Sequence, residues 1–248
     1  MTASGQRCWQ LTQFLLTQAL HHRIAWVLGA AALAVVAGAG ALRGFNFGTE
    51  ESRFFTQLAR LSLLLSGTVV AAVVGPALFG EGLATRTIPT LLTHGARRSE
   101  VVVGLLFSLW TLLGWLVLLH AGALAGVLIA YGHAAELAPA LRAVARGFGP
   151  LLVVGAGAVM AATLFQRSAL ATAATLALAG AGQLAPVIAQ AQGHSTGVAR
   201  LGWTALDWLV PNFALFDSAS PATAALYAVG YAGLYGGVAA FCFVRREL

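Results

Sequence analysis

The chain has 248 residues, of which 14 are basic and 8 acidic, so it carries a formal net charge of +6. Hydrophobic residues make up 59% and charged residues 9% of the sequence, whereas an average soluble domain has about 25% charged residues. A soluble domain of this length would lack the charges to cover its surface, and the chain is too apolar for a disordered protein. Its two cysteines, Cys8 and Cys242, are too few for a disulfide scaffold. The composition therefore predicts an integral membrane protein.

Six stretches of the sequence contain no Asp, Glu, Lys or Arg and are long enough to cross a bilayer. A helix needs about 20 apolar residues to span a hydrocarbon core of roughly 30 Å. A charge at mid-helix costs about 2.5–3.5 kcal/mol, and every charged residue lies in a connection. We therefore predict an all-α integral membrane fold, a single transmembrane domain over residues 1–248 with six transmembrane helices. The stretches are 24–42, 61–80, 101–131, 147–165, 168–190 and 222–244.

Three of these stretches allow predictions about the path of the backbone. The third stretch, 101–131, has 31 residues, which is more than one upright helix needs. It therefore either tilts or breaks, near His120–Gly122 or near Gly126. The fourth and fifth stretches are separated only by Gln166 and Arg167, which predicts a tight hairpin.

The arginines are distributed unequally between the two sides that six spans would define. The side of the termini carries eight Arg against three acidic residues, and the other side carries six Arg against five acidic residues. Because cytoplasmic loops are enriched in Arg and Lys, we expect both termini to be cytoplasmic. The positive net charge follows from this bias, so no nucleic-acid partner is expected.

The N-terminal segment, residues 1–23, has the pattern of an amphipathic helix. Between Cys8 and Arg23, apolar residues recur near helical spacing and glutamines lie between them. Such a helix lies in the cytoplasmic interface before the chain turns into the first span. The alternatives are a frayed extension of the first span, or a cleaved secretory signal that ends at the small residues Ala39 and Ala41.

The connection between the second and third stretches, residues 81–100, carries another amphipathic pattern. Thr87 and Leu91 lie one helical turn apart and share a face. Pro89 suits two short pieces, or a helix that begins near Ile88 with the proline in its first turn. A short helix at the cytoplasmic surface can dock into a groove of a partner protein. An ordinary loop, whose arginines only fix the topology, is the alternative.

The connection before the last stretch, residues 200–221, is too apolar for a water-exposed loop. Trp203, Leu206 and Leu209 recur at helical spacing, and Pro211 divides the segment. We predict two short amphipathic, re-entrant helices that dip into the outer interface beside the last span. Non-helical backbone at membrane depth is tolerated only where protein or water covers it.

The order of these features resembles the membrane subunits of the second export class of ABC transporters. Those permeases have a similar number of spans with both ends inside, and an N-terminal elbow helix. They also carry a coupling helix between the second and third spans, and broken helices before the last. The C-terminal sequence from Phe243 and the triplet Pro211–Phe213 are similar to the subgroup of the nitrous-oxide-reductase maturation permease. The resemblance assigns contact with an ATPase to Glu81, Gly82, Thr87, Ile88, Leu91, Leu92, Gly95, Arg97, Arg98 and Glu100.

This resemblance implies that ATP is hydrolysed, with Mg²⁺, by a separate cytoplasmic ABC ATPase subunit. The permease would pair with a second copy or a paralogue in a bacterial-type inner membrane and move a substrate out of the cytoplasm or the inner leaflet. The chain has no Lys and therefore no Gly-x-x-x-x-Gly-Lys-Ser/Thr phosphate loop. We expect it to bind no cofactor and to catalyse no reaction itself. Glu81 is expected to cap the coupling helix or to pair with an arginine of the elbow; a simple charge at the membrane edge is the alternative.

Other functions find less support in the residues. An intramembrane enzyme or an ion-coupled transporter needs ionisable groups within its spans, and the stretches hold no carboxylate and a single His. The outer-side histidines, His120, His133 and His194, show no i, i+4 spacing, so no metal site is predicted. A non-transporting scaffold or mechanical transmitter in a larger complex is the alternative to a permease.

Overall fold

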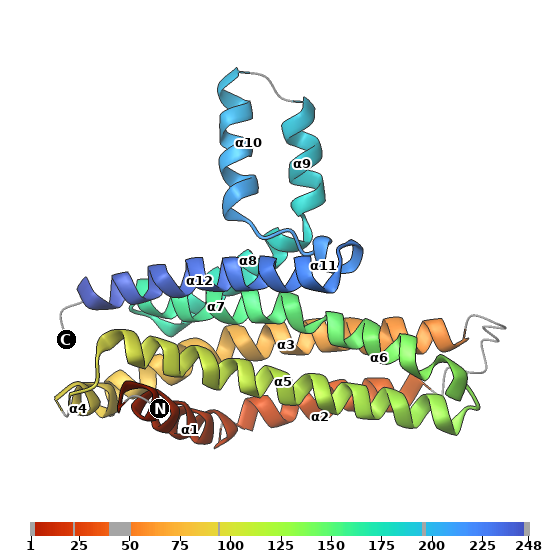
Figure 1. Ribbon diagram of the computed structural model, residues 1–248, viewed down its shortest axis with the longest axis horizontal. Coiled ribbons are helices and arrows are strands. Elements are labelled where there is room, and N and C mark those ends of the chain that lie inside the picture. Colours follow the sequence, from red (N-terminus) through yellow and green to blue (C-terminus); the bar gives the residue numbers. More distant parts are fainter. Residues whose placement is uncertain (1–2, 22, 40–50, 94, 195–196, 246–248) are drawn as a thin grey trace.

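The computed structural model describes residues 3–21, 23–39, 51–93, 95–194 and 197–245 of the chain (Figure 1). In these ranges the chain is largely α-helical and contains no β-strand, which agrees with the predicted all-α class. The helices are α1 (Ala3–His21), α2 (Arg23–Gly38), α3 (Glu51–Ala84), α4 (Thr87–Thr93), α5 (Arg98–Ala130), the 3₁₀-helix η3 (Ala134–Glu136), α6 (Leu137–Arg146), α7 (Phe148–Leu164), α8 (Ser168–Gln183), α9 (Ala185–His194), α10 (Gly197–Leu209), α11 (Leu215–Ser218) and α12 (Pro221–Arg245).

Among the described residues, four helical segments are long and apolar enough to cross a membrane. A fifth results if the pair α8 and α9, which is bent by 60°, counts as one span. The first predicted span, 24–42, coincides with α2 as far as Gly38, and residues 40–42 lie outside the described part. The chain is therefore a membrane-embedded, multi-pass helical protein, and the count of six spans stays a prediction. The four segments are Glu51–Ala84, Arg98–Ala130, Ala134–Leu164 and Pro221–Arg245.

The structure tests two predictions about the backbone, one for α5 and one for the turn after α7. α5 is one continuous helix of 33 residues, so the break considered near His120–Gly122 or Gly126 does not occur. At 1.5 Å per residue it is about 50 Å long, so it must tilt or extend beyond the hydrocarbon core. The tight hairpin is confirmed, because α7 ends at Leu164 and α8 begins at Ser168.

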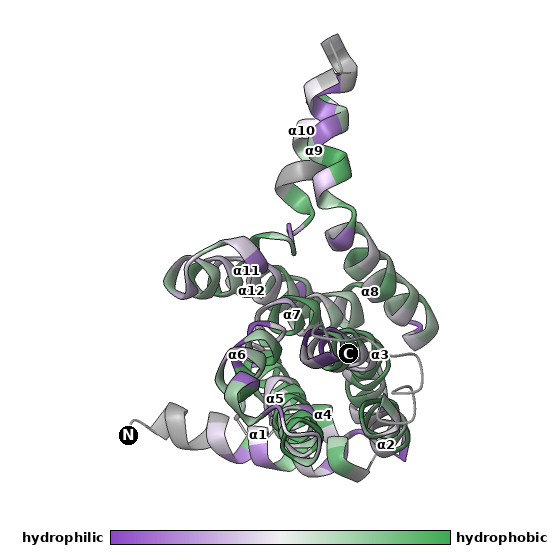
Figure 2. Cartoon of the chain, turned by 90° about the vertical axis from the view of Figure 1, so that its right-hand side faces the viewer, coloured by the Kyte–Doolittle hydropathy of each residue, from purple (hydrophilic) through white to green (hydrophobic). Residues whose placement is uncertain are grey.

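The bundle is built around α7, which α3, α5, α8 and α12 surround (Figure 2). In the segment Ala134–Leu164, which ends with α7, 72% of the most apolar window is buried, against 28% in α12. Small residues make this packing possible: a Cβ atom on Gly67 of α3 would lie 2.7 Å from Leu151 Cδ2 of α7. Lipid gives no hydrophobic drive between helices, so such close contacts hold the bundle together.

The long helices run side by side and give the bundle two ends (Figure 1). One end, called here the α4 end, carries α4, α1 and the C-terminal end of α12. The opposite end, the α6 end, carries α6 and the N-terminal end of α3. On the orientation predicted from the arginines, the α4 end is the cytoplasmic one.

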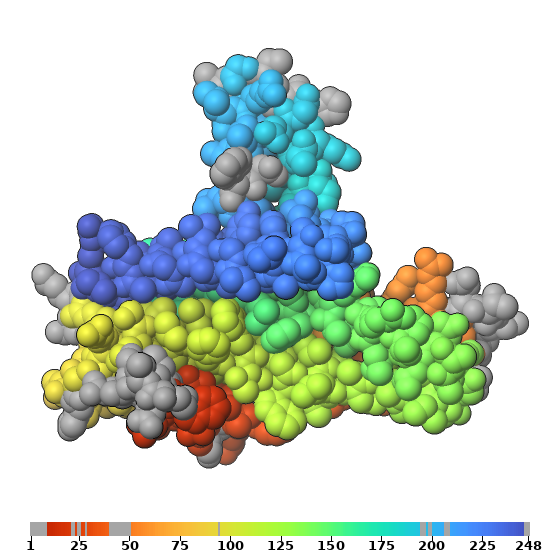
Figure 3. Space-filling view, in the orientation of Figure 1, coloured from red at the N-terminus to blue at the C-terminus, as the bar shows by residue number. Residues whose placement is uncertain are grey.

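The segment 200–221 forms helices on either side of Pro211, as predicted, but they lie in different surroundings. α11 packs against α12, whereas α10 packs on α9. The α9–α10 hairpin stands away from the bundle, across the direction of the long helices (Figures 1 and 3). Gln192 Nε2 donates a hydrogen bond across this hairpin to Thr204 Oγ1 at 2.9 Å. The expected position of the first helix beside the last span is therefore not observed, because the bend after α8 gives α10 a partner in α9.

Candidate functional site

The predicted coupling segment, residues 81–100, forms a corner between two long helices at the α4 end. α3 runs to Ala84, α4 fills most of the corner, and α5 begins at Arg98. The helix expected near Ile88 is therefore present. Pro89 lies in its first turn, where the missing N–H of a proline breaks no helical hydrogen bond.

Residues with positive φ make the chain reversals on both sides of α4. Arg86 has a φ of 57° and Gly95 a φ of 89°. A left-handed backbone costs a residue with a side chain about 1–2 kcal/mol, so the turn at Arg86 needs support. Thr85 supplies it: its Oγ1 donates to the Glu81 carbonyl oxygen at 2.8 Å and shares a hydrogen bond of 2.8 Å with Thr87 Oγ1.

Ile88 fixes the inner face of α4 against the bundle. Its side chain is 2% exposed and lies so close to Gly82 of α3 that a Cβ there would be 2.8 Å from Ile88 Cδ1. Leu92, one turn later on the same face, is half-buried and packs against the core. The inner face of α4 is therefore apolar and docked on α3.

The outer face of α4 is turned away from the bundle. Thr90 and Thr93 are exposed, and Leu91 is half-buried. The hydroxyls of Thr90 and Thr93 donate within α4 and its preceding turn, to the carbonyl oxygens of Arg86 and Thr90, both at 2.8 Å. Their methyl groups and the leucine side chain form a weakly polar surface of the kind that an amphipathic helix offers to a groove.

Arg98 ties the start of α5 to the end of α12. Its Nη1 donates to the carbonyl oxygens of Phe243 and Val244 at 2.9 and 2.7 Å, and its guanidinium lies 5.7 Å from the centre of the Phe243 ring. The last carbonyls of a helix have no partner within the helix, and a cation satisfies them favourably. This placement gives Arg98 a role inside the chain, joining two spans.

Glu100 also acts within the chain, as a cap of α5. Its carboxylate accepts a hydrogen bond of 2.9 Å from the Arg97 N–H, and the residue is 7% exposed. The residues that the resemblance assigned to ATPase contact thus differ in exposure. Exposed are Glu81, Gly95 and Arg97, half-buried are Thr87, Leu91, Leu92 and Arg98, and buried are Gly82, Ile88 and Glu100.

The predicted elbow segment forms α1, which packs on α5 at the same end of the bundle (Figure 1). Leu11 and Leu15 are buried, and a Cβ on Gly104 of α5 would lie 3.2 Å from Leu11 Cβ and 3.6 Å from Leu15 Cδ1. Trp9 on the other side of α1 is 58% exposed. α1 is therefore amphipathic and presents an aromatic side chain of the kind found at membrane interfaces.

A second constellation, which the sequence analysis did not single out, holds the break between α10 and α11, residues 210–214. Three tyrosines recur every four residues on α12 and are called here the tyrosine face: Tyr227, Tyr231 and Tyr235. Neighbouring ring centres are 4.8 and 5.8 Å apart. Their hydroxyls bind the backbone of the break and so replace helical hydrogen bonds that are lost there. The bonds are Asn212 N–H to Tyr227 Oη at 2.6 Å, Tyr231 Oη to the Val210 oxygen at 3.4 Å, and Tyr235 Oη to the Leu209 oxygen at 2.9 Å.

Two phenylalanines of this region fill close contacts with neighbouring helices. Phe213 and Phe216 are 5% and 2% exposed. A Cβ on Gly182 of α8 would lie 2.6 Å from Phe213 Cε2, and the Phe216 ring lies directly against Gly149 of α7. The Phe213 N–H also donates to the Gly182 carbonyl oxygen at 3.3 Å. The break is therefore held by α7 and α8 as well as by α12.

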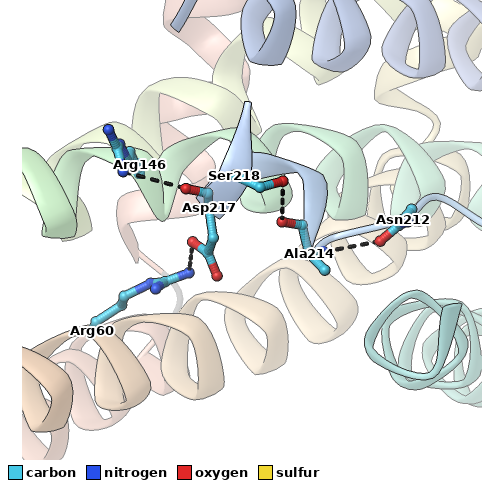
Figure 4. A network of polar contacts seen from close by, with 6 residues as sticks. All are labelled: Arg60, Arg146, Asn212, Ala214, Asp217 and Ser218. Carbon is cyan, nitrogen blue, oxygen red and sulfur yellow. Dashed lines mark hydrogen bonds and ion pairs between the residues drawn. The ribbon is translucent and has the colours of Figure 1, made fainter. Parts of the chain in front are cut away.

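An ion pair joins α11 to α3 (Figure 4). Arg60 of α3 donates to the carboxylate of Asp217, and Arg146 at the end of α6 donates to the Asp217 carbonyl oxygen at 3.4 Å. The side chains of Arg60 and Asp217 are 30% and 47% exposed, and ion pairs at such exposure contribute about 0–1 kcal/mol. The contact therefore orients α11 more than it stabilises the fold.

The sequence does carry a signal for the tyrosine face. Three tyrosines at helical spacing in one predicted span indicate a row of hydroxyls that must find polar partners. Their partners, however, lie outside that span, and counting charges does not reveal them. For metals the structure offers less: in the described ranges no group of three His, Cys, Asp or Glu side chains is placed to hold an ion.

No protein-family model matches the sequence, and no curated protein sequence matches it. The break between α10 and α11 is largely buried within the chain, whereas α4 presents an outward face at one end of the bundle. Of the two, α4 has the geometry for contact with a partner.

Proposed function

We propose that the chain is the membrane-spanning permease subunit of an ABC exporter. It moves a substrate out of the cytoplasm or the inner leaflet, and a separate subunit hydrolyses ATP with Mg²⁺. Two permeases, identical or paralogous, form the complex in a bacterial-type inner membrane, with the α4 end and both termini in the cytoplasm. The observation that carries the proposal is α4, a short helix between two spans with one docked face and one outward face.

A coupling element must be joined firmly to the helices that it moves. The contact of Ile88 with Gly82 joins α4 to α3. The hydrogen bonds of Arg98 join the next helix, α5, to the end of α12. A displacement of α4 is thereby passed to three spans. An ordinary loop, the alternative interpretation of this segment, would have no such docked helix.

The outward face of the corner suits a protein partner. Thr90, Leu91 and Thr93 offer a small, weakly polar helix surface. Arg97 is exposed beside it, and the neighbouring sequence from 86 to 98 carries three arginines and no acidic residue. This charge favours a partner with an acidic rim around an apolar groove.

Co-purification tests the proposal. The tagged full chain is extracted from its native host in mild detergent, and the bound proteins are identified by mass spectrometry. We expect an ATPase with a phosphate loop to co-purify and the complex to hydrolyse ATP. Leu91→Glu places a charge on the outer face of α4 and should release the ATPase. Arg142→Glu, at an exposed residue of α6 at the opposite end, is the matched control and should retain it.

Each other outcome has a consequence. If no ATPase co-purifies with the unaltered chain, the permease assignment is wrong and a scaffold is the better interpretation. A complex that hydrolyses ATP in proteoliposomes without moving lipid or solute would support the mechanical transmitter. If Arg142→Glu loses the ATPase and Leu91→Glu retains it, the docking surface lies at the α6 end and the assignment to α4 is wrong.

A further inference from the structure

An apolar groove opens between α2, α3 and α5 on the side of the bundle where α1 turns into α2. Its volume is about 470 Å³, and its walls include Leu20 of α1, Trp26 and Ala30 of α2, Val70 of α3 and Trp115 of α5. We propose that this groove binds one acyl chain of an anionic phospholipid from the leaflet at the α4 end, with the headgroup at Arg23.

The lining of the groove suits an acyl chain. All of its residues are apolar, and the indole N–H groups of Trp26 and Trp115 are the only polar side-chain groups among them. A hydrocarbon chain has no polar group that would be left without a hydrogen bond in such surroundings.

The direction of the groove matches a lipid whose headgroup lies at the interface. Trp26 Nε1 donates to the Leu20 carbonyl oxygen at 2.7 Å, which fixes the indole at the corner between α1 and α2. Tryptophan is enriched at this depth of a membrane. Val70, at the inner part of the groove, lies near the middle of α3. The groove therefore leads from the interface towards the bilayer centre, as an acyl chain does.

Charge favours an anionic headgroup at the interfacial end. Arg23 is exposed and begins α2, and it lies three residues before Trp26, on the same side of the helix. Residues 1–49 contain no Asp or Glu, so this part of the sequence supplies no acidic side chain to offset the arginine. An interfacial arginine raises the affinity for anionic lipid about fivefold.

Lipid binding to the purified full chain, measured by native mass spectrometry, tests the proposal. Phosphatidylglycerol and phosphatidylcholine with the same acyl chains are titrated separately. Ala30→Phe fills the groove from an exposed position, and Ala31→Phe adds the same ring at the next exposed residue, outside the groove. Burial of as few as two CH₂ groups changes affinity by about tenfold. Ala30→Phe should weaken both lipids at least that much, and Ala31→Phe should change neither.

Arg23→Gln tests the headgroup separately. It should weaken phosphatidylglycerol about fivefold and leave phosphatidylcholine unchanged. An equal loss of both lipids would overturn the assignment of the headgroup to Arg23.

Three results would overturn the acyl-chain site. The first is that Ala30→Phe binds phosphatidylglycerol as tightly as the unaltered chain, and the second is that Ala31→Phe weakens phosphatidylglycerol binding as much as Ala30→Phe does. The third is that Ala30→Phe dissociates a dimer while lipid binding persists. The last result would make the groove an interface between copies. If Ala30→Phe fails to fold, Gly29→Leu replaces it, because a Cβ at Gly29 would lie at an ordinary 3.6 Å from Leu116 Cδ1. The assay measures lipid binding and neither ATP hydrolysis nor ATPase retention, so a failure of the lipid site and a failure of the proposed function are distinguishable.

Discussion

The chain interrupts its helices in two contrasting ways. At the α4 end the corner is closed by neighbours in sequence, with Ile88 packed on Gly82. At the break of residues 210–214 the partners come from another helix, as when the Asn212 N–H donates to Tyr227, 15 residues away. A break at the end of a bundle can satisfy itself locally, whereas a break among the spans needs polar groups that other helices bring. Substitutions in the two regions should therefore differ in how much they lower the free energy of unfolding and in how far along the chain their effects extend.

The largest loss of stability is expected from Phe216→Ala in α11, next to the break of residues 210–214. Phe216 is 2% exposed, and its ring centre lies 5.6 Å from that of Tyr227. Truncation of a buried phenylalanine costs about 3–5 kcal/mol, and the free energy of unfolding in mixed micelles should fall by that amount. Phe241→Ala, at a residue that is 57% exposed, should cost less than about 1 kcal/mol. Equal losses would contradict the tight packing of Phe216.

Gly82→Val should have a smaller and more local effect. Its added side chain would meet Ile88, and overpacking of this kind costs about 1–3 kcal/mol. We expect faster hydrogen exchange in α4 with little change in α7. Gly80→Val is the matched control, because a Cβ there meets no atom within 4 Å. The double variant Gly82→Val/Ile88→Ala should recover part of the loss; without recovery, the Gly82–Ile88 contact is not what docks α4.

Removal of a single hydroxyl from the tyrosine face should lower the free energy of unfolding by less than Gly82→Val does. Tyr235→Phe removes a hydrogen bond of 2.9 Å to the Leu209 oxygen, and such bonds contribute about 0.5–1.5 kcal/mol. Tyr231→Phe removes a longer bond of 3.4 Å and should cost less. The same unfolding titration measures both. If neither substitution lowers the free energy of unfolding, the tyrosine rings and not their hydroxyls hold the break.

The two regions also show what the sequence can and cannot predict. The helix near Ile88 and the hairpin after Leu164 depend on residues close together in the chain, and local patterns predicted both. The bonds from Arg98 to the end of α12 and the pairing of α10 with α9 depend on which helices become neighbours. No local pattern contains that information, because it follows from the packing of the whole bundle. The amphipathic pattern predicted a short helix in this corner, but its docking through Ile88 on Gly82 became clear only from the contact.

The smallest effect on stability is expected from Thr90→Glu on the outer face of α4. Thr90 is exposed, and its hydroxyl donates to the Arg86 carbonyl oxygen in the turn before it, at 2.8 Å. An acidic residue in a first helical turn is tolerated, so the free energy of unfolding should change by less than about 0.5 kcal/mol. On the proposed function, the variant should nevertheless lose the ATPase, because the added charge would enter the groove of that proposed partner. If Thr90→Glu instead destabilises the chain as much as Gly82→Val, both faces of α4 are packed within the chain, and the contrast between them is wrong.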